Sequence, residues 1–179
     1  MTQRFNLKAK MGFAVCAILM LMSVASMGYA QTVSLTSAEE SWLTYMREEE
    51  KLARDVYLFL SAKWQSRIFK NIAASEQIHM DAVKTLLDRY GIADPAAGKA
   101  PGVFTNEELQ SLYYDLIQDG SVSLVEALNV GVFIEETDID DLNAGIATTK
   151  RKDIITVYSN LLAGSYNHLD AFNANLARQ

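Results

Sequence analysis

The stretch from Ser37 to Tyr90 contains neither glycine nor proline. Apolar residues recur in it at alternating intervals of three and four, which is the spacing of one face of an α-helix and not of a β-strand. The pattern slips in phase around residues 65–68. We therefore expect one helix that begins after an N-cap at Thr36 or Ser37, and a second helix that runs from about Phe69 to Tyr90 and ends at Gly91.

The second half of the chain repeats this pattern after a break. Residues 91–103 hold both prolines and three glycines, which predicts a loop. Thr105 with Glu108 resembles a capping box that opens a short helix to about Asp119. Two further apolar stripes follow, over residues 125–146 and 154–175. The sequence thus predicts an all-α fold for residues 31–179: a four-helix bundle whose second and third long helices are joined by a long crossover containing a short extra helix.

Each of the four apolar stripes is interrupted near its midpoint by polar residues. These residues are Glu50 in the first stripe, Glu76 and His79 in the second, Glu135 in the third, and Ser165 and His168 in the fourth. Residues near the midpoints of packed helices lie at one level along the bundle, whichever way the helices run. We therefore expect these side chains to meet in the core.

A core layer with three glutamates lacks a countercharge in this sequence, because no lysine or arginine occupies any of the four stripes. Buried carboxylates raise one another's pKa and cost several kcal/mol unless they are neutralised. Glutamate and histidine three residues apart on one helix supply oxygen and nitrogen ligands that suit iron or manganese. Two alternatives remain open: a metal-free layer of hydrogen-bonded histidines and glutamates, and helices whose phase turns the glutamates to solvent.

Several motifs resemble those of a known superfamily. Glu50-Lys-Leu-Ala-Arg-Asp-Val-Tyr57 resembles the first-helix signature of rubrerythrin-type ferritin-like proteins, Glu76-Gln-Ile-His79 resembles their second-helix motif, and Glu135 with Asp138 resembles the carboxylate pair of their third helix. Residues 47–172 are also similar to an uncharacterised family of ferritin-like domains, of the "domain of unknown function 2202" type.

The resemblance implies a ferritin-like bundle with a non-haem iron or manganese site of the di-metal carboxylate kind. The ligands that it implies are Glu50, Glu76, His79, Glu135 and His168. One position departs from the pattern, because Ser165 stands where the superfamily places a fourth-helix glutamate. The site could therefore be di-iron or mononuclear, and Asp138 or Glu49 could supply the missing carboxylate.

The function expected from this site is redox chemistry with dioxygen or peroxide, as an oxidase or a peroxide scavenger. A metal-binding module without turnover and a metal-free helical interaction domain are the alternatives, and a homodimer is left open. Tyr57, Tyr90 and Tyr158 lie on the stripes, where they either donate electrons to the site or simply fill the core. Cys16 is the only cysteine, so a rubredoxin-like iron centre is excluded from residues 31–179.

Residues 1–30 have the layout of a secretory signal peptide: a short basic segment, an apolar run over residues 13–25, and small residues that predict cleavage after Ala30. We expect an exported protein, periplasmic or secreted, with a retained membrane anchor as the alternative. Residues 31–179 then carry a net charge of −9, since three of the 16 basic residues and none of the 22 acidic ones precede them. This charge argues against nucleic acid or an anionic membrane surface as a partner.

Two short acidic runs accompany the predicted site. They are Glu48-Glu49-Glu50 in the first predicted helix and Asp138-Ile139-Asp140-Asp141 in the third. Charged runs of this kind usually lie on the solvated face of a helix. We expect both runs to be solvent-exposed, apart from one inward member of each.

Overall fold

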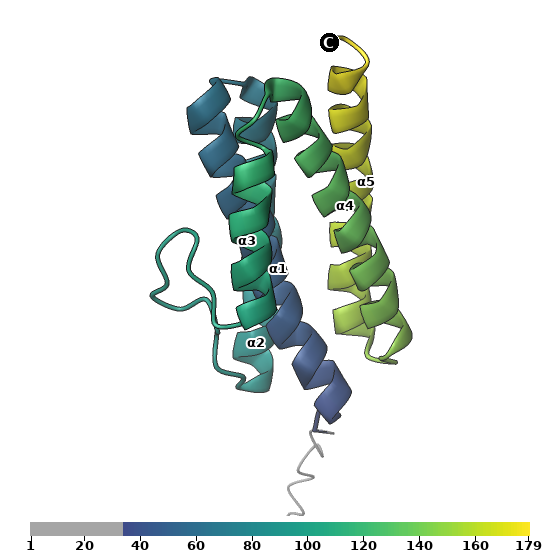
Figure 1. The fold of residues 1–179 in the computed structure, drawn as a ribbon. Coiled ribbons are helices and arrows are strands. Elements are labelled where there is room, and N and C mark those ends of the chain that lie inside the picture. Colours follow the sequence, from purple (N-terminus) through teal and green to yellow (C-terminus); the bar gives the residue numbers. More distant parts are fainter. Residues whose placement is uncertain (1–33) are drawn as a thin grey trace, which may run out of the picture. The chain divides into compact units, whose positions relative to one another are not determined.

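The computed structural model describes residues 34–179, which contain five helices and no strand (Figure 1). The helices are α1 (Ser37–Trp64), α2 (Arg67–Tyr90), α3 (Glu107–Asp119), α4 (Leu124–Ala147) and α5 (Lys152–Leu176). The predicted signal peptide lies outside the described residues. Within them, no helix combines the length and the apolar character that a membrane span requires.

The helix ends follow the local signals of the sequence. Thr36 caps α1 in a capping box with Glu39, because its hydroxyl accepts the Glu39 N–H while the Glu39 carboxylate accepts the N–H of Thr36. Gln65, the C-cap of α1, adopts a left-handed conformation with φ of 50° and so separates α1 from α2. Gly91, with φ of 69°, ends α2. The predicted break at residues 65–68 and the predicted end at Gly91 are both confirmed.

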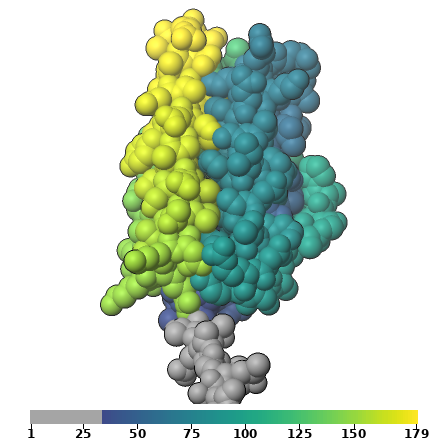
Figure 2. Space-filling model, turned by 180° about the vertical axis from the view of Figure 1, so that it is seen from behind, coloured from purple at the N-terminus to yellow at the C-terminus, as the bar shows by residue number. Residues whose placement is uncertain are grey.

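The long helices form two antiparallel hairpins, α1 with α2 and α4 with α5 (Figure 1). The hairpins meet where α1 packs on α4 and where α2 packs on α5. Figure 2 shows α2 and α5 side by side along their length on one face of the molecule. The helix α3 belongs to the connection between the hairpins and packs on α1 and α4. All four long helices therefore border one common interior.

This interior consists of two apolar clusters separated along the bundle by a polar layer. One cluster includes Tyr57, Phe69 and Phe172, and the other includes Met46 and Leu142. Each long helix contributes to both clusters and passes through the polar layer between them. The polar residues that interrupt the apolar stripes thus form a layer in the core. They do not face solvent, as a different helix phase would have required.

The start of α3 differs from the prediction. Asn106, not Thr105, is the N-cap, since its side-chain oxygen accepts the N–H groups of Glu108 and Leu109. The Thr105 hydroxyl instead donates to the carbonyl of Pro95, and the Thr105 N–H donates to Glu48. A carboxylate from a distant helix therefore fixes the beginning of α3. The predicted apolar stripe of α4 also begins differently, because Val125, its first residue, is 40% exposed.

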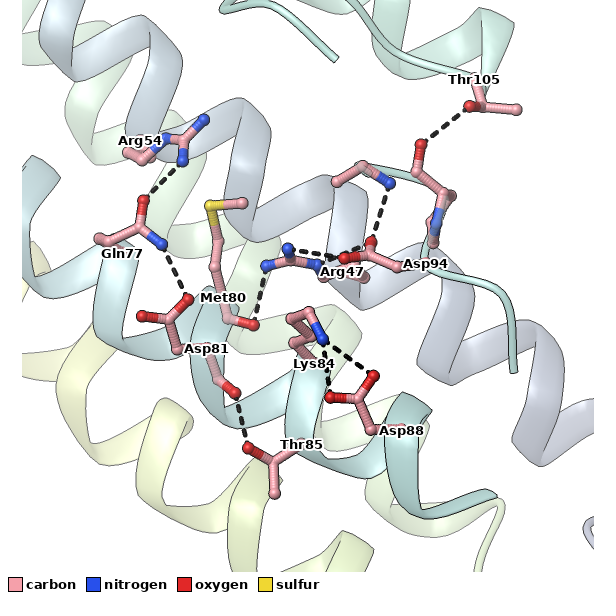
Figure 3. A network of polar contacts seen from close by, with 12 residues as sticks. Arg47, Arg54, Gln77, Met80, Asp81, Lys84, Thr85, Asp88, Asp94 and Thr105 are labelled. Atoms are coloured by element: carbon pink, nitrogen blue, oxygen red, sulfur yellow. Dashed lines mark hydrogen bonds and ion pairs between the residues drawn. The ribbon is translucent and has the colours of Figure 1, made fainter. Parts of the chain in front are cut away.

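The outer face of α1 is covered by the connection between α2 and α3. Arg47 binds the carboxylate of Asp94 with two nitrogens and donates to the carbonyl of Met80 (Figure 3). Lys51 pairs with Asp55, donates to the carbonyl of Ala100 and lies 4.4 Å from the ring centroid of Phe104. These contacts bury polar residues that helical periodicity assigns to solvent.

The expectation of a solvated acidic run in α1 is therefore wrong. Glu48, Glu49 and Glu50 are all buried, with 2%, 5% and 1% of their surfaces exposed. Glu48 accepts the N–H groups of Thr105 and Asn106, which ties α1 to the start of α3. In the second acidic run, Asp138 is buried, Asp141 is half-buried and Asp140 is exposed.

Candidate metal centre

The structure brings together all five residues that the sequence singles out as ligands. Glu50 comes from α1, Glu76 and His79 from α2, Glu135 from α4, and His168 from α5. Each is buried, and the two histidines are the most exposed of the five at 8% and 9%. Four helices thus place three carboxylates and two imidazoles in the polar layer, away from bulk water.

Glu76 lies at the middle of this group. One of its oxygens, Oε2, is 2.8 Å from Nδ1 of His79, and the other, Oε1, is 2.8 Å from Nδ1 of His168. His79 follows Glu76 by one helical turn on α2, whereas His168 reaches across from α5. A single carboxylate therefore faces two imidazole nitrogens, one with each oxygen.

Each histidine also faces a second glutamate. Oε2 of Glu50 lies 3.2 Å from Nδ1 of His79, and Oε2 of Glu135 lies 3.4 Å from Nδ1 of His168. The result is two groups of three, Glu50 with Glu76 and His79, and Glu76 with Glu135 and His168. In each group the candidate ligand atoms lie within 4.8 Å of one another. The two groups share Glu76, so one carboxylate belongs to both sets of candidate ligands.

The imidazole rings are held in place on their far sides. They are stacked, with centroids 5.5 Å apart and an angle of 27° between their planes. Nε2 of His168 lies 2.9 Å from the hydroxyl of Ser75. On the other ring, a Cβ added to Gly164 would lie 2.6 Å from Nε2 of His79, so the absence of a side chain on α5 makes room for this histidine. Both Nδ1 atoms are thereby directed at the glutamates.

Unpartnered polar atoms test whether a cation fits here. Oε1 of Glu50, Oε1 of Glu76 and Nδ1 of His168 are buried without a well-directed hydrogen bond, although the last two atoms are only 2.8 Å apart. A buried polar atom without a partner costs about 1 to 3 kcal/mol. Carboxylate oxygens and imidazole nitrogens are donors that iron and manganese accept. The donor set therefore fits a transition metal, which would satisfy these atoms together.

Without a metal, protons neutralise the group. Burial lowers the pKa of His79, but its contacts with Glu50 and Glu76 outweigh burial and raise that pKa to about 11. Burial likewise lowers the pKa of His168, while Glu135 and Glu76 raise it to about 9. Burial raises the pKa of Glu76, but the two histidines lower it to about 2. Glu76 is the carboxylate that stays charged.

The outer carboxylates behave in the opposite way. Burial and the neighbouring Asp138 raise the pKa of Glu50 well above its ordinary value. Burial is also the main cause that raises the pKa of Glu135 to about 7, and repulsion from Glu76 adds to it. The metal-free layer therefore binds protons that a cation would displace.

Ser165 on α5 contacts a buried carboxylate of the neighbouring helix α4. Its hydroxyl donates to Oδ2 of Asp138 across the α4–α5 contact, at 2.5 Å. Asp138 is 5% exposed and its other oxygen has no partner. Burial raises its pKa to about 8, and repulsion from Glu135 and Glu76 adds to this shift. Asp138 on α4 is thus a fourth carboxylate at the border of the polar layer, and it lies beside Ser165 on α5.

The three tyrosines of the stripes have different surroundings. Tyr57 is fully buried and its hydroxyl donates to Oε1 of Glu135 at 2.7 Å, so it orients one candidate ligand. Tyr158 is fully buried with an unpartnered hydroxyl. Tyr90 is only half-buried, and its hydroxyl donates to Asp153. Sequence periodicity placed all three on stripes but did not distinguish these environments.

Comparison with known proteins gives relatives of uncharacterised function. Over 138 residues the chain is 53% identical to "Uncharacterized protein MJ0754" of Methanocaldococcus jannaschii, covering 77% of this chain and 75% of that protein. The crystal structure of this hypothetical protein, 51% identical here, superposes with a TM-score of 0.79 over 80% of this chain and 82% of that one.

A more distant structure shares the fold alone. It is the crystal structure of a DUF305 fragment from Deinococcus radiodurans, 13% identical, with a TM-score of 0.62 over 82% of this chain and 99% of that one. Residues 39–179 match the family described as "Uncharacterized protein domain (DUF2202)". The chain therefore belongs to the DUF2202 family.

Proposed function

We propose that this protein is a ferritin-like metalloprotein with a dinuclear iron or manganese centre in its core. The observation that carries the proposal is the position of Glu76, whose two oxygens each face Nδ1 of a different histidine at 2.8 Å. A second glutamate completes each group of three, so two metal positions share one carboxylate. Two antiparallel hairpins joined by a long connection are also the expected arrangement of a ferritin-like bundle.

Charge supports two ions rather than one. Three glutamates and two neutral histidines leave one positive charge around two divalent ions. Asp138, buried beside Ser165, brings the same set to neutrality. Buried charge is tolerated when it is balanced nearby. This balance is the physical reason that a serine suffices where the superfamily has a fourth-helix glutamate.

The chemistry proposed for the centre is oxidation by dioxygen or reduction of peroxide. Iron or manganese would supply the redox change when bound. The chain's residues hold and orient the ligands: Tyr57 fixes Glu135 by a hydrogen bond, and Ser75 fixes the far nitrogen of His168. The apolar clusters on both sides of the layer exclude water. Export, supported by the pattern of residues 1–30, would place this chemistry outside the cytoplasm.

Metal binding without turnover is the second candidate, and the depth of the site favours it. None of the five ligands is more than 9% exposed, so little of the centre faces solvent. Consumption of hydrogen peroxide and of dioxygen by the iron-loaded full chain distinguishes the two candidates. Oxidant consumption above the level of a Glu76→Gln variant supports an oxidoreductase. Equal, background consumption by both proteins leaves metal binding as the function.

A further inference from the structure

A small pocket opens at the surface where the first turns of α1 meet α4 and the beginning of α3. Its volume is about 390 Å³, within the range of about 300 to 1,000 Å³ that is usual for small-molecule sites. The lining consists of two aromatic rings, two carboxylates and two small residues, namely Trp42, Tyr45, Glu108, Asp141, Ala38 and Ser41. None of these residues is basic, and none belongs to the candidate metal centre.

The two aromatic rings of the pocket stand at a right angle to each other. The ring centroids of Trp42 and Tyr45 lie 5.9 Å apart, and their planes meet at 88°. Both side chains are half-buried, so part of each remains open to a ligand. The face of an aromatic ring carries partial negative charge and attracts cations. Two perpendicular rings in one pocket therefore form a corner that suits a positively charged group.

Both rings are held by contacts with α4. The hydroxyl of Tyr45 donates to Oδ2 of Asp141 at 3.0 Å. A Cβ added to Gly145 would lie 3.6 Å from Cε3 of Trp42, so the indole packs against α4 at this glycine. Rings that are fixed before a ligand arrives lose less conformational entropy when it binds. The aromatic corner is thus already formed in the folded chain.

The two carboxylates decide which ligands the corner accepts. Asp141 is half-buried and Glu108 is exposed, and together they make the pocket negative. This charge favours cations and disfavours ligands that carry phosphate or carboxylate groups. Hard metal ions need about six or more oxygen ligands, which a pocket walled by two rings does not offer. The lining therefore favours an organic cation over a metal ion.

We propose that Trp42, Tyr45, Glu108 and Asp141 bind a small organic cation with a methylated ammonium head, of which choline is an example. Such a head presents its charge through apolar methyl groups, which contact ring faces and need no hydrogen-bond acceptor. The proposal goes beyond the metal centre and does not depend on it, because the two sites share no residue.

Isothermal titration calorimetry of the full chain with choline, at constant ionic strength, tests the proposal. We expect one saturable site per chain. The neutral analogue of choline, in which a tert-butyl group replaces the trimethylammonium group, should bind about tenfold more weakly or less. Phosphocholine should also bind more weakly than choline, because Glu108 and Asp141 repel its phosphate. Absence of saturable choline binding, or equal binding of the neutral analogue or of phosphocholine, overturns the proposal.

Substitutions locate the binding in this pocket. Trp42→Leu should weaken choline binding about tenfold. Glu108→Gln, at an exposed position where folding is not at risk, should weaken it about two- to fivefold. Glu107→Gln removes the same charge from an exposed position of α3 outside the pocket and should bind like the wild type. Unchanged affinity in Glu108→Gln, or equal losses in Glu107→Gln and Glu108→Gln, contradicts the site.

Fluorescence gives a second, local readout. The chain has two tryptophans, so a Trp64→Phe variant reports on Trp42 alone. Its emission should change as choline saturates the site, and an unchanged emission would place the ligand elsewhere. Glu76→Gln should bind choline like the wild type, so a failure of the metal centre leaves this site standing.

Discussion

The rings of His79 and His168 are stacked 5.5 Å apart, and each directs its Nδ1 at a different oxygen of Glu76. The two histidines come from α2 and α5, 89 positions apart in the chain. Because both histidines face Glu76, both proposed metal positions depend on this one residue. Loss of this one carboxylate should therefore affect the whole centre, whereas loss of an outer glutamate should affect one half.

Substitution of Glu76 tests this dependence. Glu76→Gln keeps the shape of the side chain but removes the charge and one acceptor oxygen, so we expect fewer than one tightly bound transition metal per chain. Glu136→Gln, on the exposed face of α4, should bind like the wild type. Metal analysis after gel filtration measures both. Equal losses of bound metal in the two variants would show that Glu136 also faces the core, so that the inward face of α4 is wrongly assigned.

Replacement of Gly164 tests whether His79 needs the space beside it. Gly164→Ala places a methyl group 2.6 Å from Nε2 of His79 and should push the ring away from Glu50 and Glu76. We expect metal affinity to fall about tenfold or more, as it does when supports of a ligand are lost. Alanine favours helix by about 1 kcal/mol over glycine, so α5 itself is not weakened. Unchanged affinity would mean that His79 is not a ligand. Asn167→Ala, at an exposed position of α5, is the control.

Removal of the Tyr57 hydroxyl tests the hydrogen bond that orients Glu135. Tyr57→Phe leaves Oε1 of Glu135 without its buried donor, which should lower the free energy of unfolding of the metal-free protein by about 1 to 3 kcal/mol. Urea denaturation measures the change. Tyr166→Phe, whose side chain is 50% exposed, should alter stability by less than about 0.5 kcal/mol. A similar, small effect in both variants would contradict the described role of Tyr57.

The ion pair between Arg47 and Asp94 gives the fold a dependence on pH. Burial raises the pKa of Asp94, but hydrogen bonds from Arg47 and from the N–H of Ala96 outweigh it and hold that pKa below its ordinary value. A carboxyl group with a lowered pKa in the folded state stabilises above its unfolded pKa of about 3.9. This stabilisation is lost as the pH falls through the folded-state pKa.

Comparison of the wild type with Asp94→Asn isolates this contribution. The variant should be less stable by about 1 to 3 kcal/mol near neutral pH, because Arg47 loses its charged partner. The difference should shrink as the pH falls through the lowered folded-state pKa of Asp94, where the carboxylate takes up a proton. Urea denaturation at several pH values measures it. A difference that stays constant as the pH falls through this pKa would show that the charge of Asp94 is not the cause.

Much of the fold follows from local sequence signals. Helical spacing together with Gln65–Ile68, Gly91 and the proline-rich loop predicts the four long helices, and midpoint register predicts that Glu50, Glu76, His79, Glu135 and His168 meet. These features depend on residues close in sequence or on the common level of packed helices. They could be read without knowledge of the tertiary contacts.

The remaining features depend on contacts that periodicity does not encode. Glu48 and Lys51 are buried because the loop before α3 covers them, and Asn106 caps α3 because Glu48 takes the N–H of Thr105. Likewise, the sequence has a serine and no carboxylate at position 165, and only the contact between α4 and α5 brings the carboxylate of Asp138 beside it. Each case joins residues from distant parts of the chain, so only the assembled bundle reveals them.

Anaerobic loading of the purified full chain with ferrous iron, followed by metal analysis and an optical spectrum, tests the central claim most directly. Because two groups of ligands share Glu76, the account predicts two tightly bound iron ions per chain and their loss in Glu76→Gln. Fewer than one tightly bound ion per wild-type chain, with the fold intact by circular dichroism, would contradict a metal centre in this core.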